Sequence, residues 1–407
     1  MIEVTTQEVD QLVAWLSSIS DGEEEGVTRL LYSPSWNQAV KELADKFEEI
    51  GMKVEYDEVG NLYGTIEGTE EPDSIIATGS HVDTVVSGGS LDGQLGILSS
   101  YLAIRELLKD GKPKKSLRII VLAEEEGSRF PYAFWGSKNV FGIADRADVE
   151  DIEDSEGIKF VDAMRESGFD FLDGEPRFKD MDAFVELHIE QGNALEKAGL
   201  AVGVVNSIVG QKRFDVTLKG EANHAGTTKM VYRRDAVDAM SRMMSQCLDK
   251  AREIGDPLVL TFGHITVVPN VVNVVPGEVT FSIDCRHTTQ EDLDEFAEWM
   301  VQKMEDVATD YNIDIDVDMW MDEAPVPMDE DLVKMFEEVC AEGNLDYQVM
   351  HSGAGHDAQI FGPYVPTVMI FVPSIDGISH NPAEATKTEE IVQGIKALAE
   401  GLRRLAY

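Results

Sequence analysis

The stretch between residues 75 and 96 constrains the fold of this chain more than any other. An apolar run at residues 75–78 stops at Gly-Ser-His-Val-Asp-Thr, residues 79–84. A glycine-rich segment that contains Asp92 follows, and residues 94–109 have the pattern of a helix. The order predicts a strand, a loop and a helix. His81 and Asp92 are then expected on loops at the end of a strand, where α/β proteins usually carry their chemistry.

The rest of the pattern predicts two domains. With 407 residues, the chain is longer than one compact core usually allows. Apolar strands at 116–123 and 183–189 alternate with helices, which predicts an α/β domain with a mixed, mostly parallel sheet covered by helices. After residue 206 the order is strand, helix, two strands, helix and strand, typical of an inserted α+β domain with a four-stranded sheet and two helices. We expect the first domain over residues 1–207 and 321–407, and the inserted domain over 208–320.

The composition excludes some partners. The formal net charge is −43, whereas nucleic acids and anionic membrane surfaces require clustered basic residues. No apolar run reaches the length of a membrane span, and the N-terminus lacks a basic region followed by an apolar one, so we expect a cytoplasmic protein. The three cysteines lack the short spacing of a thiolate metal site and are expected to be reduced thiols.

Side chains that bind divalent metals stand at the ends of several predicted strands. They are His81, Asp92, one of the glutamates at 124–126, His188 and His380. Buried ionisable groups are costly unless they are paired or bind a metal, so packing alone explains this placement poorly. Five such ligands suit two ions about 3.5 to 4 Å apart with Asp92 between them. Zinc, manganese and cobalt all accept imidazole and carboxylate ligands.

A site of this kind also needs a general base that is not a ligand. Adjacent residues of an extended chain point in opposite directions. One of Glu125 and Glu126 can therefore bind metal while the other reaches the water that attacks the substrate.

Several motifs together resemble the carbamoylase and amidohydrolase branch of the M20 dinuclear metallopeptidase-like family. They are Gly-Ser-His-Val-Asp-Thr at 79–84, Leu-Asp-Gly at 91–93, Glu-Glu-Gly-Ser-Arg-Phe at 125–130, Glu-Leu-His-Ile-Glu-Gln-Gly at 186–192, Asn-His-Ala-Gly-Thr-Thr at 223–228 and Ser-His-Asn-Pro-Ala-Glu at 379–384. Within that branch, residues 130–138, 284–287 and 351–358 are similar to the members that hydrolyse allantoate. The resemblance covers nearly the whole chain and is weakest at about 145–180.

The resemblance implies a catalytic first domain that holds two divalent metal ions per subunit. His81, Asp92 and His188 would hold one ion, and Asp92, Glu126 and His380 the other, with Glu125 as the base. The implied substrate contacts are His224, which would also be catalytic, and Asn273, Arg286, Gln191 and Gln211. The loop with Gly355 is either a backbone contact to the substrate or a tight turn between a strand and a helix.

The inserted domain would serve as a lid and as the interface of a homodimer, and the histidine of the Asn-His-Ala-Gly motif can enter the partner's site in this family. This chain departs from the family at Lys229, where relatives commonly have proline. A lysine there loosens the loop that carries His224.

The implied activity is hydrolysis of a ureido C–N bond in a small anionic substrate. Allantoate, which would give ureidoglycine, ammonia and carbon dioxide, is the expected substrate, and the alternative is an N-carbamoyl-L-amino acid or another ureido compound. A rival interpretation is a metal-binding dimer module without catalysis. That rival predicts loss of Glu125 or of a ligand, yet all of them are present in the sequence.

Overall fold

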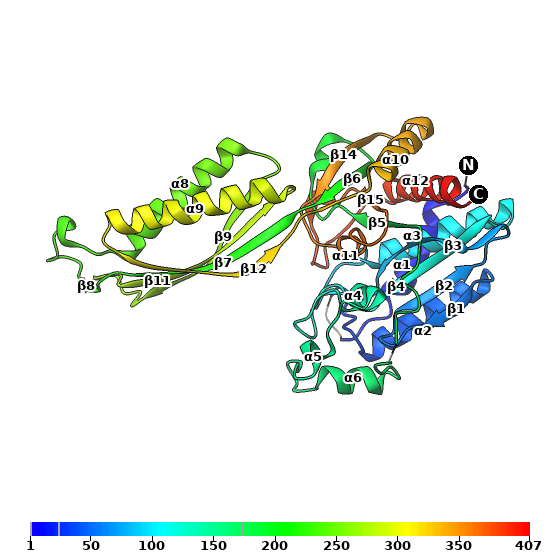
Figure 1. Ribbon diagram of the computed structural model, residues 1–407, viewed down its shortest axis with the longest axis horizontal. Helices are drawn as coiled ribbons and strands as arrows, with labels where there is room; N and C mark the ends of the chain where they lie inside the picture. Colours follow the sequence, from blue (N-terminus) through cyan, green and yellow to red (C-terminus); the bar gives the residue numbers. More distant parts are fainter. Residues whose placement is uncertain (1, 23–24, 173) are drawn as a thin grey trace. The chain divides into compact units, whose positions relative to one another are not determined.

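The computed structural model describes residues 2–22, 25–172 and 174–407. The chain divides into two compact units (Figure 1). The first unit comprises Met1–Asn206 and Met328–Tyr407, and the second comprises Ser207–Pro327. Each unit has an apolar core of its own. A second domain inserted into the first is therefore present, as an α/β domain interrupted by an α+β domain requires.

A mixed sheet forms the centre of the first unit, and the end of its strand β6 and all of its short edge strand β13 fall just inside the residue range of the second unit. Across the described residues its nine strands have the order β1-β2-β4-β3-β5-β15-β6-β13, with β14 paired to β6. Strands β4, β3, β5 and β15 run parallel, and antiparallel strands flank them on both sides. The strand bounds are β1 Lys53–Tyr56, β2 Leu62–Ile66, β3 Glu71–His81, β4 Lys115–Leu122, β5 Ala183–Ile189, β6 Val202–Ile208, β13 Val326–Pro327, β14 Tyr347–Ser352 and β15 Thr367–Val372.

The helices of the first unit precede, connect or follow the strands of this sheet. Their bounds are α1 Thr6–Ser17, α2 Pro34–Glu49, α3 Gln94–Leu107, α4 Trp135–Phe141, α5 Arg146–Val149, α6 Phe160–Glu166, α7 Ala194–Ala198, α10 Glu330–Gly343, α11 Asp357–Phe361 and α12 Thr388–Ala406. Helices α3 and α12 pack side by side and both contact the central strands (Figure 1). The predicted α/β class, a mixed sheet with parallel centre and helical cover, is confirmed.

Strand β5 shows why its sequence is apolar almost throughout. Alternate side chains of a strand point to opposite faces of the sheet. Phe184 stacks on Phe361 of α11, with ring centroids 3.9 Å apart, whereas Leu187 lies against Gly394 of α12. Both faces of β5 are thus covered, which is the usual state of a parallel strand.

Two helices are placed where they fix the ends of strands. Helix α3 approaches the sheet closely, because a Cβ on Gly96 would lie 2.5 Å from the carbonyl oxygen of Leu187. Helix α2 begins at a Ser33 cap that accepts the N–H of Trp36 at 3.2 Å. The Trp36 indole is buried and donates to the carbonyl of Ala123 at 2.9 Å, one residue beyond β4. The packing of α2 therefore fixes the chain just before Glu124.

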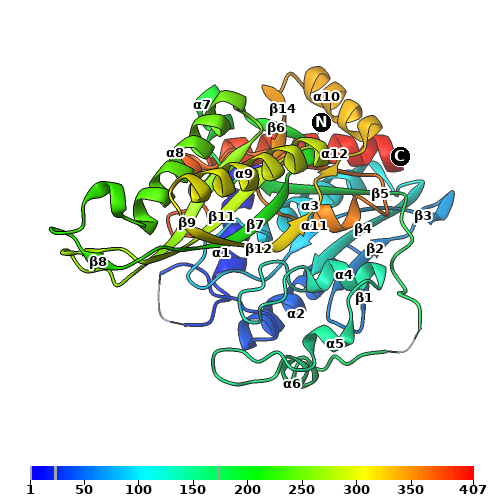
Figure 2. The same ribbon diagram turned by 60° about the vertical axis from the view of Figure 1, so that its left-hand side comes forward.

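The second unit has the predicted four-stranded sheet and two helices. The sheet order is β12-β7-β11-β9, and all three pairings are antiparallel. Figure 2 shows α8 and α9 along one face of these strands, and both helices contact β7 and β11. The elements are β7 Gly210–Lys219, β8 Asn223–His224, α8 Ala236–Ile254, β9 Val259–Val268, β10 Val274–Val275, β11 Glu278–His287, α9 Gln290–Asp310 and β12 Asp314–Glu323.

Alternation of buried and exposed residues along the strands explains how this sheet packs against its two helices. Every second residue of β7 and β11 is buried, and the others are partly or fully exposed. The last strand, β12, pairs with β7 as far as Glu323, which lies opposite Gln211. The second unit accordingly extends to Pro327, whereas the sequence pattern placed its end at 320.

In the part of the chain that the structure describes, no helix combines the length and the apolar composition that crossing a membrane requires. Cys247, Cys285 and Cys340 are buried free thiols. Burial raises the pKa of each thiol to about 12.

The acidic composition leads to a prediction about stability. The chain has 77 Asp and Glu against 34 Lys and Arg, and like charges repel more strongly in the compact state. Raising the salt concentration from about 0.01 M to about 1 M shortens the screening length from about 30 Å to about 3 Å. We expect the thermal midpoint of unfolding to rise by several degrees over this range, equally in NaCl and KCl. A midpoint that stays constant or falls in both salts would contradict the prediction.

Candidate metal centre and active site

Three adjacent parallel strands deliver polar side chains to one edge of the sheet. His81 is the last residue of β3 and pairs with Leu122 at the end of β4. Glu124 to Glu126 follow β4 directly, and His188 lies near the end of β5. Because β4, β3 and β5 run parallel, their carboxyl ends meet at the same edge.

The carboxylate of Asp92 lies at the centre of the cluster. Its Oδ1 lies 3.4 Å from His81 Nε2 and 3.2 Å from His188 Nε2. Its Oδ2 lies 3.4 Å from His380 Nε2, and the same nitrogen lies 3.4 Å from Glu126 Oε1. The two oxygens of one carboxylate thus face two different sets of side chains.

Three groups of side chains among the described residues could each hold a metal ion. The first contains His81, Asp92 and His188, the second His81, Glu125 and Glu126, and the third Asp92, Glu126 and His380. Within each group the ligand atoms lie within 4.8 Å of one another. The first and third groups share Asp92, so the donors fit two neighbouring divalent ions of the kind that imidazole and carboxylate bind.

The imidazoles are oriented as metal ligands require. Nδ1 of His81 lies 3.1 Å from the backbone oxygen of Asp83, and Nδ1 of His188 lies 2.9 Å from that of Ile189. In the neutral form each Nδ1 carries the proton, and Nε2, which faces Asp92, is the atom able to bind a metal; Nε2 of His188 accepts the N–H of Gly93 at 3.2 Å. Such outer hydrogen bonds fix the tautomer and the ring plane of metal-binding histidines.

The charges of the cluster are strongly coupled. Burial opposes ionisation of Asp92, but hydrogen bonds with His188, His380 and His81 hold its pKa well below the ordinary value. The hydrogen bond with Asp92 raises the pKa of His380 to about 9. Burial, together with the negative charge of Asp92, raises the pKa of Glu126 to about 7. Crowded carboxylates of this kind are stabilised by positive charge, which metal ions supply.

Glu125 differs from Glu126 in its contacts with this cluster. Burial raises its pKa well above the ordinary value, against the opposing effect of His81. Glu125 shares a possible metal group with His81 but not with Asp92, whereas Glu126 belongs to the group of Asp92 and His380. The two ligand groups that share Asp92 are complete without Glu125. Its carboxylate lies close to them and is available for another role.

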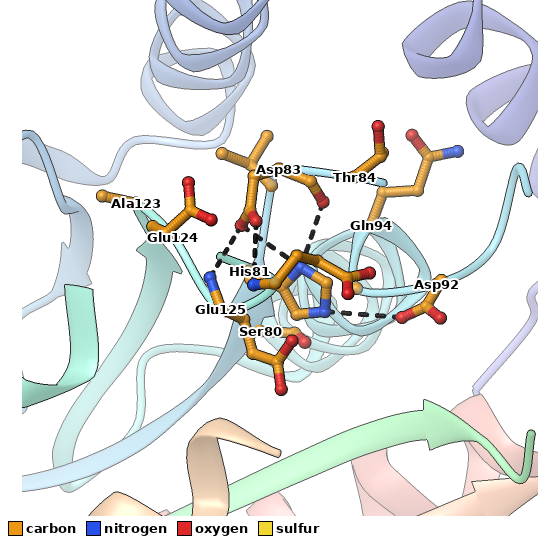
Figure 3. A network of polar contacts seen from close by, with 12 residues as sticks. Ser80, His81, Asp83, Thr84, Asp92, Gln94, Ala123, Glu124 and Glu125 are labelled. Carbon is orange, nitrogen blue, oxygen red and sulfur yellow. Dashed lines mark hydrogen bonds and ion pairs between the residues drawn. The ribbon is translucent and has the colours of Figure 1, made fainter. Parts of the chain in front are cut away.

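Asp83 connects the ends of β3 and β4, a role that the sequence analysis did not assign. Its two carboxylate oxygens accept the backbone N–H groups of Glu125 and Glu126 at 3.0 and 3.1 Å. Its Oδ1 also lies 3.3 Å from Nδ1 of His81. Figure 3 shows the Asp83 side chain between the His81 ring and the backbone of Glu125. The spacing His-x-Asp was the available signal, since side chains two residues apart in an extended chain lie on the same side, and Asp83 follows the last residue of β3 by two.

Glu384 plays a similar part on the other side of the cluster. Its buried carboxylate accepts the backbone N–H groups of Leu91 and Asp92 at 2.9 and 3.1 Å. Ser379 Oγ lies 2.9 Å from Asp92 Oδ2 and 3.0 Å from Glu384 Oε2. Almost 300 residues separate the two segments, so sequence spacing gave no indication of this contact.

Further buried polar groups lie close to His188. Glu186 lies on the same face of β5 as His188. It accepts hydrogen bonds from the Ser80 hydroxyl at 2.7 Å and from the N–H of Ala358 at 3.0 Å. The ring of His356 meets that of His188 edge to face, with centroids 4.6 Å apart. Burial, reinforced by the charge of His188, keeps the pKa of His356 well below its ordinary value. Gly355 lies in the short connection between β14 and α11, where it packs against Phe134 and Gln359.

The other predicted contact in the first unit is Gln191. Its Nε2 donates to Asp92 Oδ2 at 2.8 Å, and its backbone N–H donates to Ser374 Oγ at 3.0 Å. Its φ of 58° lies in the left-handed region, which few residues other than glycine adopt. The structure therefore places Gln191 directly beside the predicted metal ligands.

The remaining four predicted residues belong to the second unit and form two pairs. His224 pairs with Val274 in a two-stranded ribbon of β8 and β10, and the N–H of Ala225 donates to the carbonyl of Asn273 at 3.0 Å. Gln211 and Arg286 are direct cross-strand partners on β7 and β11.

Arg286 is oriented by its neighbour two residues earlier. Its Nε and Nη2 donate to the two oxygens of Asp284 at 2.7 and 3.1 Å. Arg213, opposite Asp284 on β7, donates to the same carboxylate at 2.8 Å. Burial opposes ionisation of Asp284, but Arg286 and then Arg213 hold its pKa below the ordinary value.

Comparison with known proteins agrees with this geometry. Residues 77–404 match the model of Peptidase family M20/M25/M40. The chain is 52% identical to an allantoate amidohydrolase of Escherichia coli over 410 residues, covering 100% of both sequences. It is 43% identical to an allantoate amidohydrolase of Bacillus subtilis over 401 residues, covering 98% of this chain and 97% of the relative.

Its structure also superposes on a crystal structure of an amidase of the hydantoinase/carbamoylase family from Burkholderia multivorans. The TM-score is 0.95 at 29% identity, covering 100% of this chain and 98% of the other. A shared sheet, a shared inserted domain and a family match over most of the length leave one assignment: the chain belongs to peptidase family M20/M25/M40.

Proposed function

We propose that this protein is a metal-dependent amidohydrolase that cleaves a ureido C–N bond of allantoate. The observation that carries the proposal is the convergence of His81, Asp92, Glu126, His188 and His380 on two ligand groups that share Asp92. Whole-length similarity to two allantoate amidohydrolases favours allantoate as the substrate. The alternative is an N-carbamoyl-L-amino acid, which would use the same metal ligands.

Two divalent ions would occupy the cluster. His81, Asp92 and His188 would hold one, and Asp92, Glu126 and His380 the other. Zinc and manganese both suit these donors, and cobalt is a further possibility. When bound, such ions polarise a carbonyl and make water acidic enough to react near neutral pH.

Glu125 would act as the general base and then as the acid. Its raised pKa suits a group that accepts a proton from water and passes it to the leaving nitrogen. A ureido carbonyl is a poor electrophile because both nitrogens donate electrons to it, so cleavage needs both activation of the carbonyl and protonation of the leaving group. One water is consumed, and the products are ureidoglycine, carbon dioxide and ammonia.

The side chains of the second unit would recognise the substrate. Arg286, whose guanidinium is oriented by Asp284 through Nε and Nη2, would bind the carboxylate of allantoate. His224 would donate to the developing oxyanion, an interaction worth about 3 to 4 kcal/mol when preorganised. Asn273, Gln211, Gln191 and the backbone at Gly355 would orient the ureido groups.

The preference between substrates is testable. Allantoate has a second ureido group that the amide side chains can bind, and a site built to bind such a group rejects analogues without it. We expect kcat/KM for allantoate to exceed that for N-carbamoyl-L-amino acids by about tenfold or more. Ammonia release measures the first reaction, and release of the free amino acid measures the second. Faster hydrolysis of the carbamoyl amino acids would reverse the substrate assignment.

The variant Glu125→Gln tests whether Glu125 is the general base. Glutamine keeps the size of the side chain but cannot accept the proton from water. We expect kcat to fall by a factor of about 10² to 10⁴ while two ions per chain remain bound. Undiminished turnover with the ions in place would show that Glu125 is not the base.

Metal removal gives a separate prediction. A chelator should abolish ammonia release, and adding back zinc or manganese should restore it with two ions bound per chain, as measured by elemental analysis. Because the ions bind the folded state, we expect the thermal midpoint to rise on reloading. Full activity of the metal-free protein, or saturation at one ion, would contradict the two-ion site.

We also propose that the protein is a homodimer joined through the second unit and that it works in the cytoplasm. Three free cysteines suit a reducing compartment. Strand β9 lies at the edge of its sheet, and an exposed apolar edge is a template for pairing with another chain. Large apolar side chains are exposed along β9 and the loop after it: Val259, Ile265, Val268, Val271 and Val272. Patches of this kind mark protein interfaces.

Ile265→Asp tests this interface. Ile265 is 45% exposed, and Ile143 in the first unit is 46% exposed, so Ile143→Asp is a matched control. Light scattering of the eluting protein should give twice the mass of one chain for the wild type and for Ile143→Asp. We expect Ile265→Asp to elute at the mass of a single chain, because a charge would be buried at the edge of β9. A monomeric wild type, or an unchanged Ile265→Asp dimer, would refute the proposed interface.

A further inference from the structure

Arg29 is a fully buried arginine in the segment between α1 and α2. Its side chain has no exposed surface, and all five of its N–H groups meet oxygen atoms. Nε donates to the carbonyl of Ile19 at 3.1 Å, and Nη2 donates to the carbonyls of Ile19 and Leu16. Nη1 donates to the carbonyl of Val82 and to Oε1 of Gln94, each at 3.1 Å. Three neutral backbone carbonyls accept four of these five hydrogen bonds, and the neutral side-chain amide of Gln94 accepts the fifth.

A guanidinium that is buried among neutral acceptors is energetically unfavourable compared with an apolar side chain of similar size. Burying a guanidinium is strongly unfavourable unless attraction to a counter-charge offsets the loss of water. Burial lowers the pKa of Arg29 to about 10, and the carboxylates of Asp83 and Asp21 act in the opposite direction. The side chain therefore remains charged at neutral pH. A methionine or leucine would pack at lower cost, so the contacts of the guanidinium require another explanation.

The backbone beside Arg29 is fastened to the loop that follows β3. Its N–H donates to Thr84 Oγ1 at 2.9 Å, and its carbonyl accepts the N–H of Thr84 at 3.1 Å. Val27 and Gly88 exchange two backbone hydrogen bonds of 3.0 and 2.9 Å. Residues 27–29 thus form an irregular ladder with residues 84–88, and this ladder fixes where the Arg29 side chain enters the core.

The two acceptors of Nη1 belong to the two segments that carry predicted metal ligands. Val82 lies between His81 and Asp83. The hydrogen bond from Arg29 to the Val82 carbonyl therefore restrains the peptide group between Val82 and Asp83, directly after His81. Gln94 is the second residue after Asp92, and its Nε2 in turn donates to Ser17 Oγ at 2.7 Å and to the carbonyl of Ser90. Figure 3 shows Thr84 and Gln94 in the polar network around His81, Asp83 and Asp92. One nitrogen of Arg29 therefore restrains both ligand-bearing segments.

We propose that Arg29 is a positioning residue of the metal centre, which sets the separation of His81 and Asp92 by holding the carbonyl of Val82 and the side chain of Gln94. The inference rests on the proposed function, because it assumes that these two residues bind metal. Arg29 itself touches neither substrate nor metal. Its charge also lies near the carboxylate of Asp83, which holds the backbone of Glu125 and Glu126.

Four variants separate positioning from simple packing. Arg29→Met removes the charge and all five donors, and Arg29→Lys keeps the charge without the planar fork. Gln94→Met leaves Arg29 in place but removes its link to the Asp92 segment. Arg118→Met is the matched control, because Arg118 is also a buried arginine of the first unit, 8% exposed, but it lies on β4 over the rings of Tyr63 and Phe178.

The readout is zinc affinity of the metal-free proteins, measured by competition with a chromophoric chelator, beside the thermal midpoint of each metal-free protein. Outer hydrogen-bond partners of metal ligands typically contribute 10- to 100-fold in affinity. We expect a loss of about that size for Arg29→Met, smaller losses for Arg29→Lys and Gln94→Met, and a change of less than about threefold for Arg118→Met, whatever its thermal midpoint.

Two results would overturn the inference. One is zinc affinity within about threefold of the wild type for both Arg29→Met and Gln94→Met, against the 10- to 100-fold expectation. The other is an equal loss for Arg118→Met at an equal loss of thermal stability, which would show a general effect of destabilisation. If Arg29→Met does not fold, Gln94→Met decides alone. A wild-type protein that binds no zinc or manganese would instead refute the proposed function and leave the contacts of Arg29 without this explanation.

Discussion

The carboxylate of Asp92 is the constraint on which the rest of the first unit depends. Three imidazoles approach its two oxygens within 3.4 Å, from β3, from β5 and from the loop before α12. Glu126 lies within the same cluster as Asp92, Glu125 lies close to His81, and the pKa values of both glutamates are raised. Such a density of buried ionisable groups is unfavourable without compensating cations. The fold therefore has to hold these groups in place against their mutual repulsion.

Backbone contacts meet that requirement. Asp83 holds the N–H groups after β4, and Glu384 holds those around Asp92. Trp36 fixes the carbonyl of Ala123 at the end of β4, and Arg29 fixes the carbonyl of Val82 at the end of β3. Each of these side chains acts on the main chain next to a predicted ligand, so the ligands are placed by buried groups from distant parts of the sequence. Outer hydrogen bonds of this kind orient the ligands of a metal site.

The sequence predicted the features that depend on local pattern. Apolar runs ending in His, Asp or Glu identified the strand ends, and parallel order then brought His81, Glu126 and His188 to one edge. It could not predict the roles of Arg29 or Glu384, because these depend on which carbonyl or N–H each side chain meets across the fold. Nor could it predict that β12 pairs with β7 as far as Glu323, because that pairing depends on the register of the sheet rather than on local composition.

The acidic surface raises a separate physical question, which is how an anion reaches the site of a protein with a net charge of −43. The summed field opposes an anionic substrate, but at physiological salt it is screened within about 8 Å. Local charge then decides. On the second sheet, two arginines, Arg213 and Arg286, donate to the single carboxylate of Asp284. Asp284 thus orients Arg286, and in the proposed function this guanidinium is the local positive charge that attracts the substrate carboxylate on an otherwise repulsive surface.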